Sequence, residues 1–235
     1  TMSNVFVISY YFSVMVQCIA FFIQAYGYQL KVVPSLIPLK YALNIEFFVS
    51  IVELLVYIWI GFSLNDYNSV MSKRYLDWFI TTNFLLISFS LMFIFFNERQ
   101  TDKSAEETKK VHDKKSLIDD NIRSFSPILL FNNLMLLVGY MGEKHVISKY
   151  YSTSIGFVFF LLSFYYLYNS FAKFTFTGRR ILYVLAFVWA LYGVAHTFQD
   201  KWKNTCYNLL DLISKNAFGI IVVFMLIHYQ KKAII

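Results

Sequence analysis

The fold is decided by residues 204–227, whose sequence is NTCYNLLDLISKNAFGIIVVFMLI. The run is apolar and long enough to cross a bilayer, which takes about 20 residues, yet it contains Asp211 and Lys215. A lysine at the bilayer centre costs about 2.5–3.5 kcal/mol, so it indicates a functional site by default. Asp211 precedes Lys215 by one helical turn, on the same face. The alternative is an ion pair that only neutralises itself.

Similar apolar runs recur along the whole chain. Its 235 residues are 58% hydrophobic and only 15% charged, whereas soluble domains are about 45–50% apolar and about 25% charged. The sequence therefore predicts an all-α integral, multi-pass membrane protein with one domain, residues 1–235, and a seven-helix bundle. The predicted spans are about 4–28, 38–63, 70–97, 125–142, 147–172, 178–199 and 204–229. The first run lacks a preceding basic region and exceeds a signal-peptide core, so we predict a true span.

The net charge of +7 is explained by membrane topology rather than by nucleic acid binding. If the N-terminus lies outside, the inner side carries 14 of the 21 basic residues. The positive-inside rule then favours an outer N-terminus and an inner C-terminus. Residues 98–124 form a polar inner loop in this scheme. Ser104 and Glu107 resemble a capping box there, which favours a short interfacial helix, and a solvated linker is the alternative.

Chemistry typical of enzymes is missing from the sequence pattern. Cys18 and Cys206 provide neither a disulfide framework nor metal-ligand spacing. The predicted spans contain no His/Cys metal set and no nucleophile–base pair. We therefore expect no metal and no enzymatic activity.

Six of the charged residues within the predicted spans stand out. Facing lipid would be too costly for them, so they must converge on the interior of the bundle, with partners or water. They are Glu46, Glu53, Arg74, Asp77, Asp211 and Lys215.

The third span carries the sharpest pattern. Arg74, Asp77, Thr81 and Ser88 follow at intervals of three, four and seven residues, which places them on one helical face. Asp77 and Asp211 can then both oppose the nitrogen of Lys215. Two acids around one lysine favour a counter-ion cluster over a purely structural pair.

Three segments resemble a known family. Residues 74–82, RYLDWFITT, resemble the third-helix signature of microbial (type 1) rhodopsins, and LDLISK at 210–215, followed by Phe218 and Gly219, resembles their seventh-helix signature. Residues 189–192, WALY, are similar to the aromatic wall of their retinal pocket. The matches occur in the order that the family requires.

The resemblance implies a functional role for the charged residues and for the aromatic residues around them. Lys215 would carry all-trans-retinal as a protonated Schiff base, with Asp77 as primary counter-ion and proton acceptor and Asp211 as second counter-ion. A lysine amine in an apolar pocket is the group that forms such linkages. Arg74 would organise the outward half of the site. The implied retinal pocket comprises Trp78, Thr81, Trp189, Tyr192, Gly193 and His196.

Two of these positions depart from the family pattern. Gly193 occupies the place of a proline that usually kinks the helix, and His196 replaces a pocket tryptophan. His196 is interpreted either as a proton-accepting or colour-tuning group, or as a polar residue satisfied by water near the outer helix end.

The choice between pump and channel depends on the second and third helices. Outward proton pumps of the family usually carry a carboxylate eleven residues after the counter-ion, and Ser88, which cannot donate a proton near neutral pH, stands there. Glu46 and Glu53 lie seven residues apart, on one face, and acidic side chains along a route favour a cation pathway. The alternative is that both are protonated and hydrogen-bonded between helices.

The two glutamates and Ser88 also resemble the first group of viral rhodopsins, from giant viruses. That resemblance implies a light-gated cation channel in which Glu46, Glu53, Ser13 and Asn208 line constrictions, and we expect Ser88 on the same ion pathway. We therefore expect a channel for monovalent cations, with divalent cations or protons as further candidates. The alternatives are an outward proton pump, a sensory rhodopsin signalling through a partner, and a seven-helix receptor without retinal. The expected surroundings are membrane lipid, in the host cell membrane if the chain is viral, with homo-oligomers left open.

Overall fold

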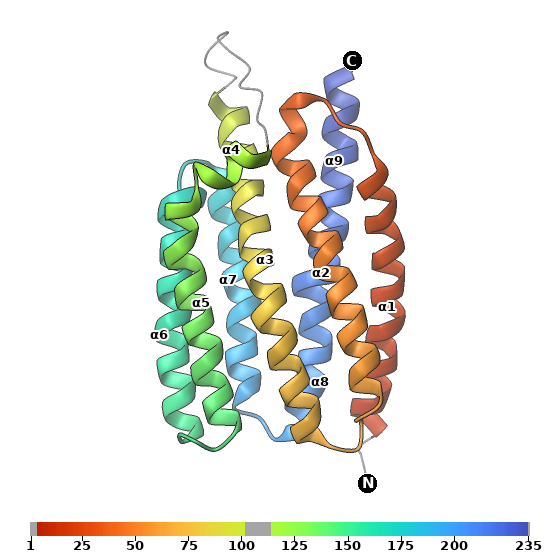
Figure 1. Cartoon of the computed structure of the whole chain (residues 1–235), viewed down its shortest axis with the longest axis vertical. Coiled ribbons are helices and arrows are strands. Elements are labelled where there is room, and N and C mark those ends of the chain that lie inside the picture. The colour runs from red at the N-terminus through yellow and green to blue at the C-terminus, as the bar shows by residue number, and fades with distance from the viewer. Residues whose placement is uncertain (1–3, 102–113, 235) are drawn as a thin grey trace.

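The computed structural model describes residues 4–101 and 114–234, and within them seven helices are long and apolar enough to cross a membrane (Figure 1). The predicted all-α seven-helix fold is confirmed, and each predicted span lies within a few residues of an observed one. The elements are α1 (Asn4–Gln29), η1 (Pro34–Leu36), α2 (Ile37–Gly61), α3 (Tyr67–Thr101), α4 (Lys114–Asp119), α5 (Ile122–Glu143), α6 (Lys149–Leu167), η2 (Tyr168–Ala172), α7 (Phe176–His196), α8 (Asp200–Asp211), η3 (Leu212–Ala217) and α9 (Phe218–Ile234).

Local sequence signals fix several helix starts. Ser148 caps α6 by accepting a hydrogen bond from the amide of Tyr151 at 3.4 Å, and Thr175 caps α7 by accepting from Gly178 at 3.0 Å. Side-chain oxygens satisfy amides that a helix start leaves without partners. The proline at position 34 opens η1, ahead of α2, where its missing N–H costs nothing.

Two stretches differ from the sequence-based expectation. Residues 98–101 of the predicted polar loop continue α3 as helix, and α4 supplies a short helix at 114–119. The proposed capping box at Ser104 and Glu107 lies outside the described residues. The seventh crossing, predicted as one regular helix, is built from α8, the π-helix η3 and α9, and Lys215 lies in η3. A π turn carries one more residue than an α turn, and periodicity alone does not reveal it.

The outer surface of the bundle is apolar, and several charged residues of the spans lie inside it. Large apolar side chains such as Phe22, Leu55 and Phe187 face outward, where lipid tails would surround them. All six charged residues singled out above are buried. These ionisable groups therefore face the interior of the bundle, where they avoid the high cost of contact with lipid.

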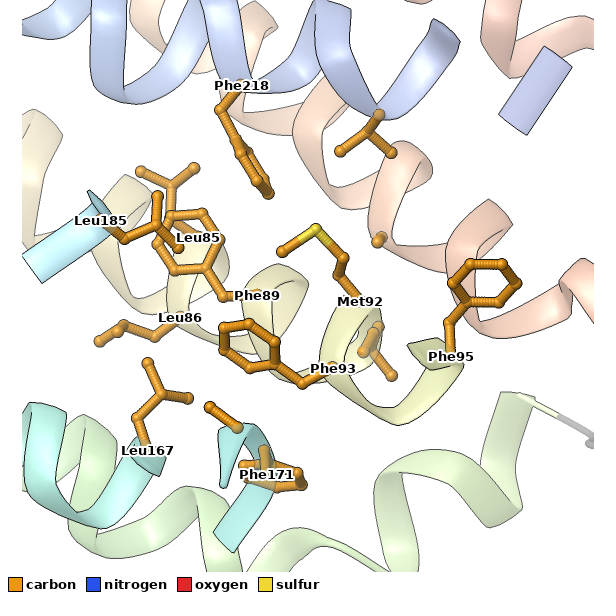
Figure 2. Packing of buried hydrophobic residues seen from close by; sticks show 14 of the residues in the cluster. Leu85, Leu86, Phe89, Met92, Phe93, Phe95, Leu167, Phe171, Leu185 and Phe218 are labelled. Carbon is orange, nitrogen blue, oxygen red and sulfur yellow. The ribbon is translucent and has the colours of Figure 1, made fainter. Parts of the chain in front are cut away.

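An apolar core fills the half of the bundle toward the C-terminal end of α3 (Figure 2). Phe89 lies at its centre, with ring centroids 4.6 Å from Phe218 and 5.9 Å from Trp189. Met92 and Phe93 continue this packing along α3 (Figure 2). Close packing here holds α3, α7 and α9 together on the side of the charged centre toward the C-terminal end of α3.

The two ends of the described chain lie at opposite ends of the bundle (Figure 1). This follows from an odd number of crossings. That the N-terminal end faces outward stays a prediction from the distribution of basic residues.

Candidate functional site

The side chain of Lys215 lies among three buried carboxylates from three helices. Its Nζ is 2.5 Å from Oδ2 of Asp77, 3.6 Å from Oδ1 of Asp211 and 3.7 Å from Oε1 of Glu53. Asp77 and Asp211 meet the lysine as the sequence predicted. Glu53, which the sequence placed only on an ion pathway, is a third carboxylate beside the amine.

Glu53 is held in this position by the residue that follows the lysine. The side-chain amide of Asn216 donates a hydrogen bond of 2.9 Å to Oε2 of Glu53, while Oε1 faces Lys215. Lys215 and Asn216, which are consecutive residues of the π-helix η3, thus both contact Glu53 of α2. The sequence offered no signal for this contact, since helical periodicity fixes the face of α2 but not its register against η3.

Asp211 is fixed by tyrosines from two helices. Tyr57 of α2 donates to Oδ2 at 2.8 Å, and Tyr192 of α7 donates to Oδ1 at 2.8 Å. Tyr192 also lies 2.7 Å from the hydroxyl of Ser214. Arg74 approaches the same carboxylate at 3.2 Å. The Asp211 carboxyl group is thus anchored between α2, α3 and α7, whereas Oδ1 of Asp77 lacks a hydrogen-bond partner in the described chain.

Arg74 organises the half of the site toward the N-terminal end of α3. The buried guanidinium donates to the hydroxyl of Tyr57 at 3.1 Å and to Oδ1 of Asn204 at 3.3 Å, and it also donates to Asn208. The hydroxyl of Ser13 on α1 donates to the carbonyl of Asn208 at 3.1 Å. Ser13 and Asn208, both predicted pathway residues, therefore lie together beside Arg74.

An aromatic cavity opens beside Lys215. The rings of Trp78 and Tyr207 meet edge to face with centroids 4.9 Å apart, and Tyr192 stacks on Tyr207 at 5.8 Å. Five of the six predicted pocket residues line the cavity: Trp78, Trp189, Tyr192, Gly193 and His196. Such a mostly apolar, aromatic enclosure ending at an amine fits a long conjugated aldehyde bound through lysine.

Thr81 is the exception among the predicted pocket residues. Its hydroxyl donates to the carbonyl of Asp77 at 2.9 Å, one turn back on α3, and the neighbouring Thr82 contributes to the cavity wall instead. In this structure Thr82, and not Thr81, therefore lines the cavity, and a role for Thr81 beside the chromophore stays a prediction. Thr82 in turn accepts a hydrogen bond of 2.8 Å from Asn132 of α5.

Gly193 has a steric role in the cavity wall. A Cβ at this position would lie 2.6 Å from the ring of Phe157 on α6. Glycine therefore allows α7 to approach an aromatic ring that also lines the cavity.

Three asparagines join α3 to α5 inside the membrane. Asn83 donates to Asn133 at 3.0 Å, and Asn132 donates to Asn83 at 3.1 Å. Asn132 and Asn133 interrupt the apolar sequence of the span 125–142. The structure explains their presence, because each finds a polar partner on α3.

The remaining predicted pathway residues lie on the other side of Lys215. The hydroxyl of Ser88 donates to the carbonyl of Ala42 at 3.3 Å, and Ser88 also interacts with the side chain of Glu46. Glu46 and Glu53 are both buried on one face of α2. The structure thus brings Ser88 to Glu46. Glu46 precedes Glu53, the glutamate beside Lys215, by seven residues on α2.

His196 lies at the end of α7, buried against α5 and α6. Its Nδ1 is 3.7 Å from Oε2 of Glu143, and its Nε2 is 3.4 Å from the hydroxyl of Ser152. Glu143 is paired with Lys203 of α8. The sequence singled out His196 but missed Glu143 and Lys203, because both stand near predicted span ends and looked like loop residues.

A seven-helix membrane bundle with a buried lysine, carboxylate counter-ions and an aromatic cavity defines the class of retinal-binding membrane proteins. Comparison with protein families agrees: the family described as bacteriorhodopsin-like protein matches residues 4–229. The chain therefore belongs to the bacteriorhodopsin-like family, whose members bind a retinal chromophore through a lysine. The resemblance to microbial rhodopsins is confirmed.

Solved structures give the same result. The crystal structure of viral rhodopsin OLPVRII is similar with 27% identity and a TM-score of 0.76, over 94% of this chain and 96% of that chain. The blue light-absorbing proteorhodopsin from Med12 is similar with 18% identity and a TM-score of 0.72, over 97% and 100% of the two chains. The light-driven proton pump of Coccomyxa subellipsoidea is similar with 15% identity and a TM-score of 0.67, over 95% and 98%. A comparison with curated proteins gave no match.

Proposed function

We propose that this chain is a retinal photoreceptor that acts as a light-gated cation channel. All-trans-retinal would be held at Lys215 as a protonated Schiff base, with Asp77 as primary counter-ion and proton acceptor and Asp211 as second counter-ion. When bound, the retinal supplies absorption of visible light and an isomerisation that perturbs the charges around the lysine. The proposal includes no enzymatic activity, and it keeps the first viral group and the outer N-terminus as predictions.

The observation that carries the proposal is the position of Glu53. This buried carboxylate faces both Lys215, at 3.7 Å, and Asn216. Any change at the lysine nitrogen therefore acts directly on an acidic group of α2, the helix whose glutamates the sequence predicts to line a cation route. Acidic side chains along a narrow route select for cations.

Unpartnered polar atoms extend from this centre along α1 and α2. Within the described chain, both amide atoms of Gln17 and the hydroxyl of Ser50 lack hydrogen-bond partners, as do Oε1 of Gln24 and Oε1 of Glu46. All four side chains are buried. Buried polar groups in proteins are nearly always satisfied, so a row of exceptions favours a route that water or ions can enter.

The proposal predicts that Glu53→Gln lowers the cation photocurrent at least several-fold. Glutamine retains the shape of the side chain but removes the charge beside Lys215, and it keeps an acceptor for Asn216. Voltage-clamped cells under swapped sodium and proton gradients measure both the current and its reversal potential. Asp119→Asn, which removes an exposed carboxylate of α4, is the matched control and should leave the current unchanged.

Three outcomes would contradict the channel. A current that stays outward at all accessible voltages would identify a pump. A negligible current with an intact visible absorption band would favour the sensory alternative. A Glu53→Gln photocurrent equal to that of the unmodified protein would remove Glu53 from the pathway.

One contact favours the outward proton pump as second candidate. Ser88 occupies the usual donor position and cannot donate a proton itself, but it interacts with the buried side chain of Glu46 on α2. A carboxylate is thus present at that level of the bundle, supplied by a different helix. Glu46 could return a proton toward Lys215 in place of a residue on α3.

Glu46→Gln separates the two candidates. In a channel, we expect a smaller photocurrent whose sign still follows the cation gradient, because the variant alters a pathway and not the driving force. In a pump, the variant would slow the recovery of the initial absorption band strongly, and added external acid would not reverse the current. Flash absorption and voltage clamp on the same variant measure both quantities.

A further inference from the structure

A second charged cluster lies at the opposite wall of the aromatic cavity from Lys215. Lys215 and His196 both line the cavity. The side chain of Lys215 contacts carboxylates of α2 and α3, whereas the side chain of His196 contacts residues of α5 and α6. A chromophore attached at Lys215 and filling this cavity therefore extends toward His196. The family resemblance assigns no charge cluster to this place.

The cluster connects the cavity to the protein surface. Oε2 of Glu143 lies 3.7 Å from Nδ1 of His196, and the other carboxylate oxygen accepts a hydrogen bond from Lys203. Nζ of Lys203 also lies 2.7 Å from Asp200. The side chain of Lys203 is 2% exposed and that of Asp200 is 57% exposed. Contacts through Glu143 and Lys203 therefore link His196 to an exposed carboxylate at the protein surface.

Other groups face the cluster from the neighbouring helices. The hydroxyl of Ser152 on α6 approaches Nε2 of His196, and Lys149 on the same helix acts on the ring electrostatically. The phenols of Tyr75 on α3 and Tyr207 on α8 interact with Glu143. The charges are Glu143 and Asp200 against Lys149 and Lys203, so they balance while His196 is neutral. Protonation of His196 would then place one unbalanced positive charge at the cavity wall.

A glycine makes this arrangement possible. A Cβ at Gly142 of α5 would lie 2.0 Å from the hydroxyl of Ser152 and 3.6 Å from Nε2 of His196. Glycine therefore allows Ser152 and the imidazole to meet against α5. The close approach leaves His196 with one hydrogen-bonding partner and one anionic partner, which suits both the neutral ring and the imidazolium.

We propose that His196 is a wavelength-determining residue whose charge, set by the cluster of Glu143, Lys203, Asp200 and Lys149, shifts the absorption band of the bound chromophore. In a protonated conjugated imine, excitation moves positive charge away from the nitrogen. A positive charge at the far end of the cavity opposes that movement and raises the excitation energy. Protonated His196 therefore shifts the band to shorter wavelength, and neutral His196 restores it.

Absorption spectra of the retinal-loaded protein test the proposal. The band is followed from about pH 8 to about pH 3, a range that extends well below the ordinary titration of histidine because the ring is buried. We expect a shift to shorter wavelength on acidification that is lost in His196→Gln and retained in His228→Gln. His228 is an exposed histidine near the end of α9, so it controls for histidine loss as such. Identical titrations of the unmodified protein and His196→Gln would overturn the proposal, as would a band that does not move.

Acidification can also change the charge of groups other than His196, including the carboxylates near Lys215. A variant with a fixed positive charge at position 196 therefore gives a second test. His196→Lys should absorb at shorter wavelength than His196→Gln at every pH, and equal band positions would overturn the proposal.

Nuclear magnetic resonance of ring-labelled histidine gives a readout without retinal. In the retinal-free protein, an imidazolium signal absent from His196→Gln should appear on acidification. Glu143→Gln should lower the pH of half-protonation by about one unit, because it removes the anion beside the ring. An unchanged midpoint would show that the cluster does not set the charge of His196.

The inference requires retinal at Lys215 but not a particular direction of ion flow. Failure to form a visible band would reject the proposed function, whereas this measurement would still test the cluster.

Discussion

Substitution of Lys215 by alanine is expected to abolish the visible absorption band and every light-driven current. Lys215 is the lysine at the aromatic cavity, and its amine is the nucleophile that forms the linkage with an aldehyde. Alanine leaves the cavity walls in place but removes the bond. Absorption spectroscopy after addition of all-trans-retinal measures the effect, and Lys173→Ala, at an exposed position, should form the band normally.

Loss of the band could also follow from misfolding, because Lys215→Ala leaves three carboxylates without their cation. Retinal supplied as a preformed imine with a small alkylamine distinguishes the two causes. A folded variant should regain a visible band, because the imine nitrogen takes the place of Nζ beside Asp77. A Lys215→Ala protein that binds retinal covalently and absorbs like the unmodified protein would refute the assignment of the lysine.

Substitution of Arg74 by methionine is expected to destabilise the protein by about 3–5 kcal/mol, the range found when one partner of a buried ion pair is removed. The guanidinium is fully buried and bonded to Tyr57, Asn204, Asn208 and Asp211. Methionine fills much of the space but satisfies none of these groups. Equilibrium unfolding in mixed detergent, followed by helical circular dichroism, measures the change.

Arg123→Met is the matched control for this experiment. Arg123 is exposed near the start of α5, so its loss should change the free energy of unfolding by less than about 0.5 kcal/mol. Equal stability of the Arg74→Met and Arg123→Met variants would show that the network around Arg74 contributes nothing to the fold.

The spans and the inward-facing residues were predictable because both depend on properties of a single helix. Length and hydropathy define a span, and spacing puts Arg74 and Asp77 on one face. Contacts between helices were predictable only where the family resemblance supplied them, as for Asp77 and Lys215. The contact of Glu53 with Lys215 was missed because it depends on the register of α2 and on the π turn of η3.

Contacts of residues near the span ends could not be predicted from the sequence either. Glu143 and Lys203 stand where a helix meets the membrane surface, and charged residues there usually face water. Their pairing depends on how α5 and α8 approach each other at one end of the bundle. The spacing puts Thr81 on the face of Asp77, where its hydroxyl bonds to the Asp77 carbonyl, and only the structure shows that the neighbouring Thr82 lines the cavity.

The three carboxylates around Lys215 have an electrical consequence for the centre of the protein. Asp77, Asp211 and Glu53 supply three negative charges when ionised, and Lys215 and Arg74 supply two positive ones. Full ionisation would leave one excess negative charge in the low-dielectric interior, which is costly without compensation. The centre is therefore one positive charge short, and a retained proton or a passing cation completes it. In the proposed channel, full ionisation of the three carboxylates would therefore favour a cation at this centre.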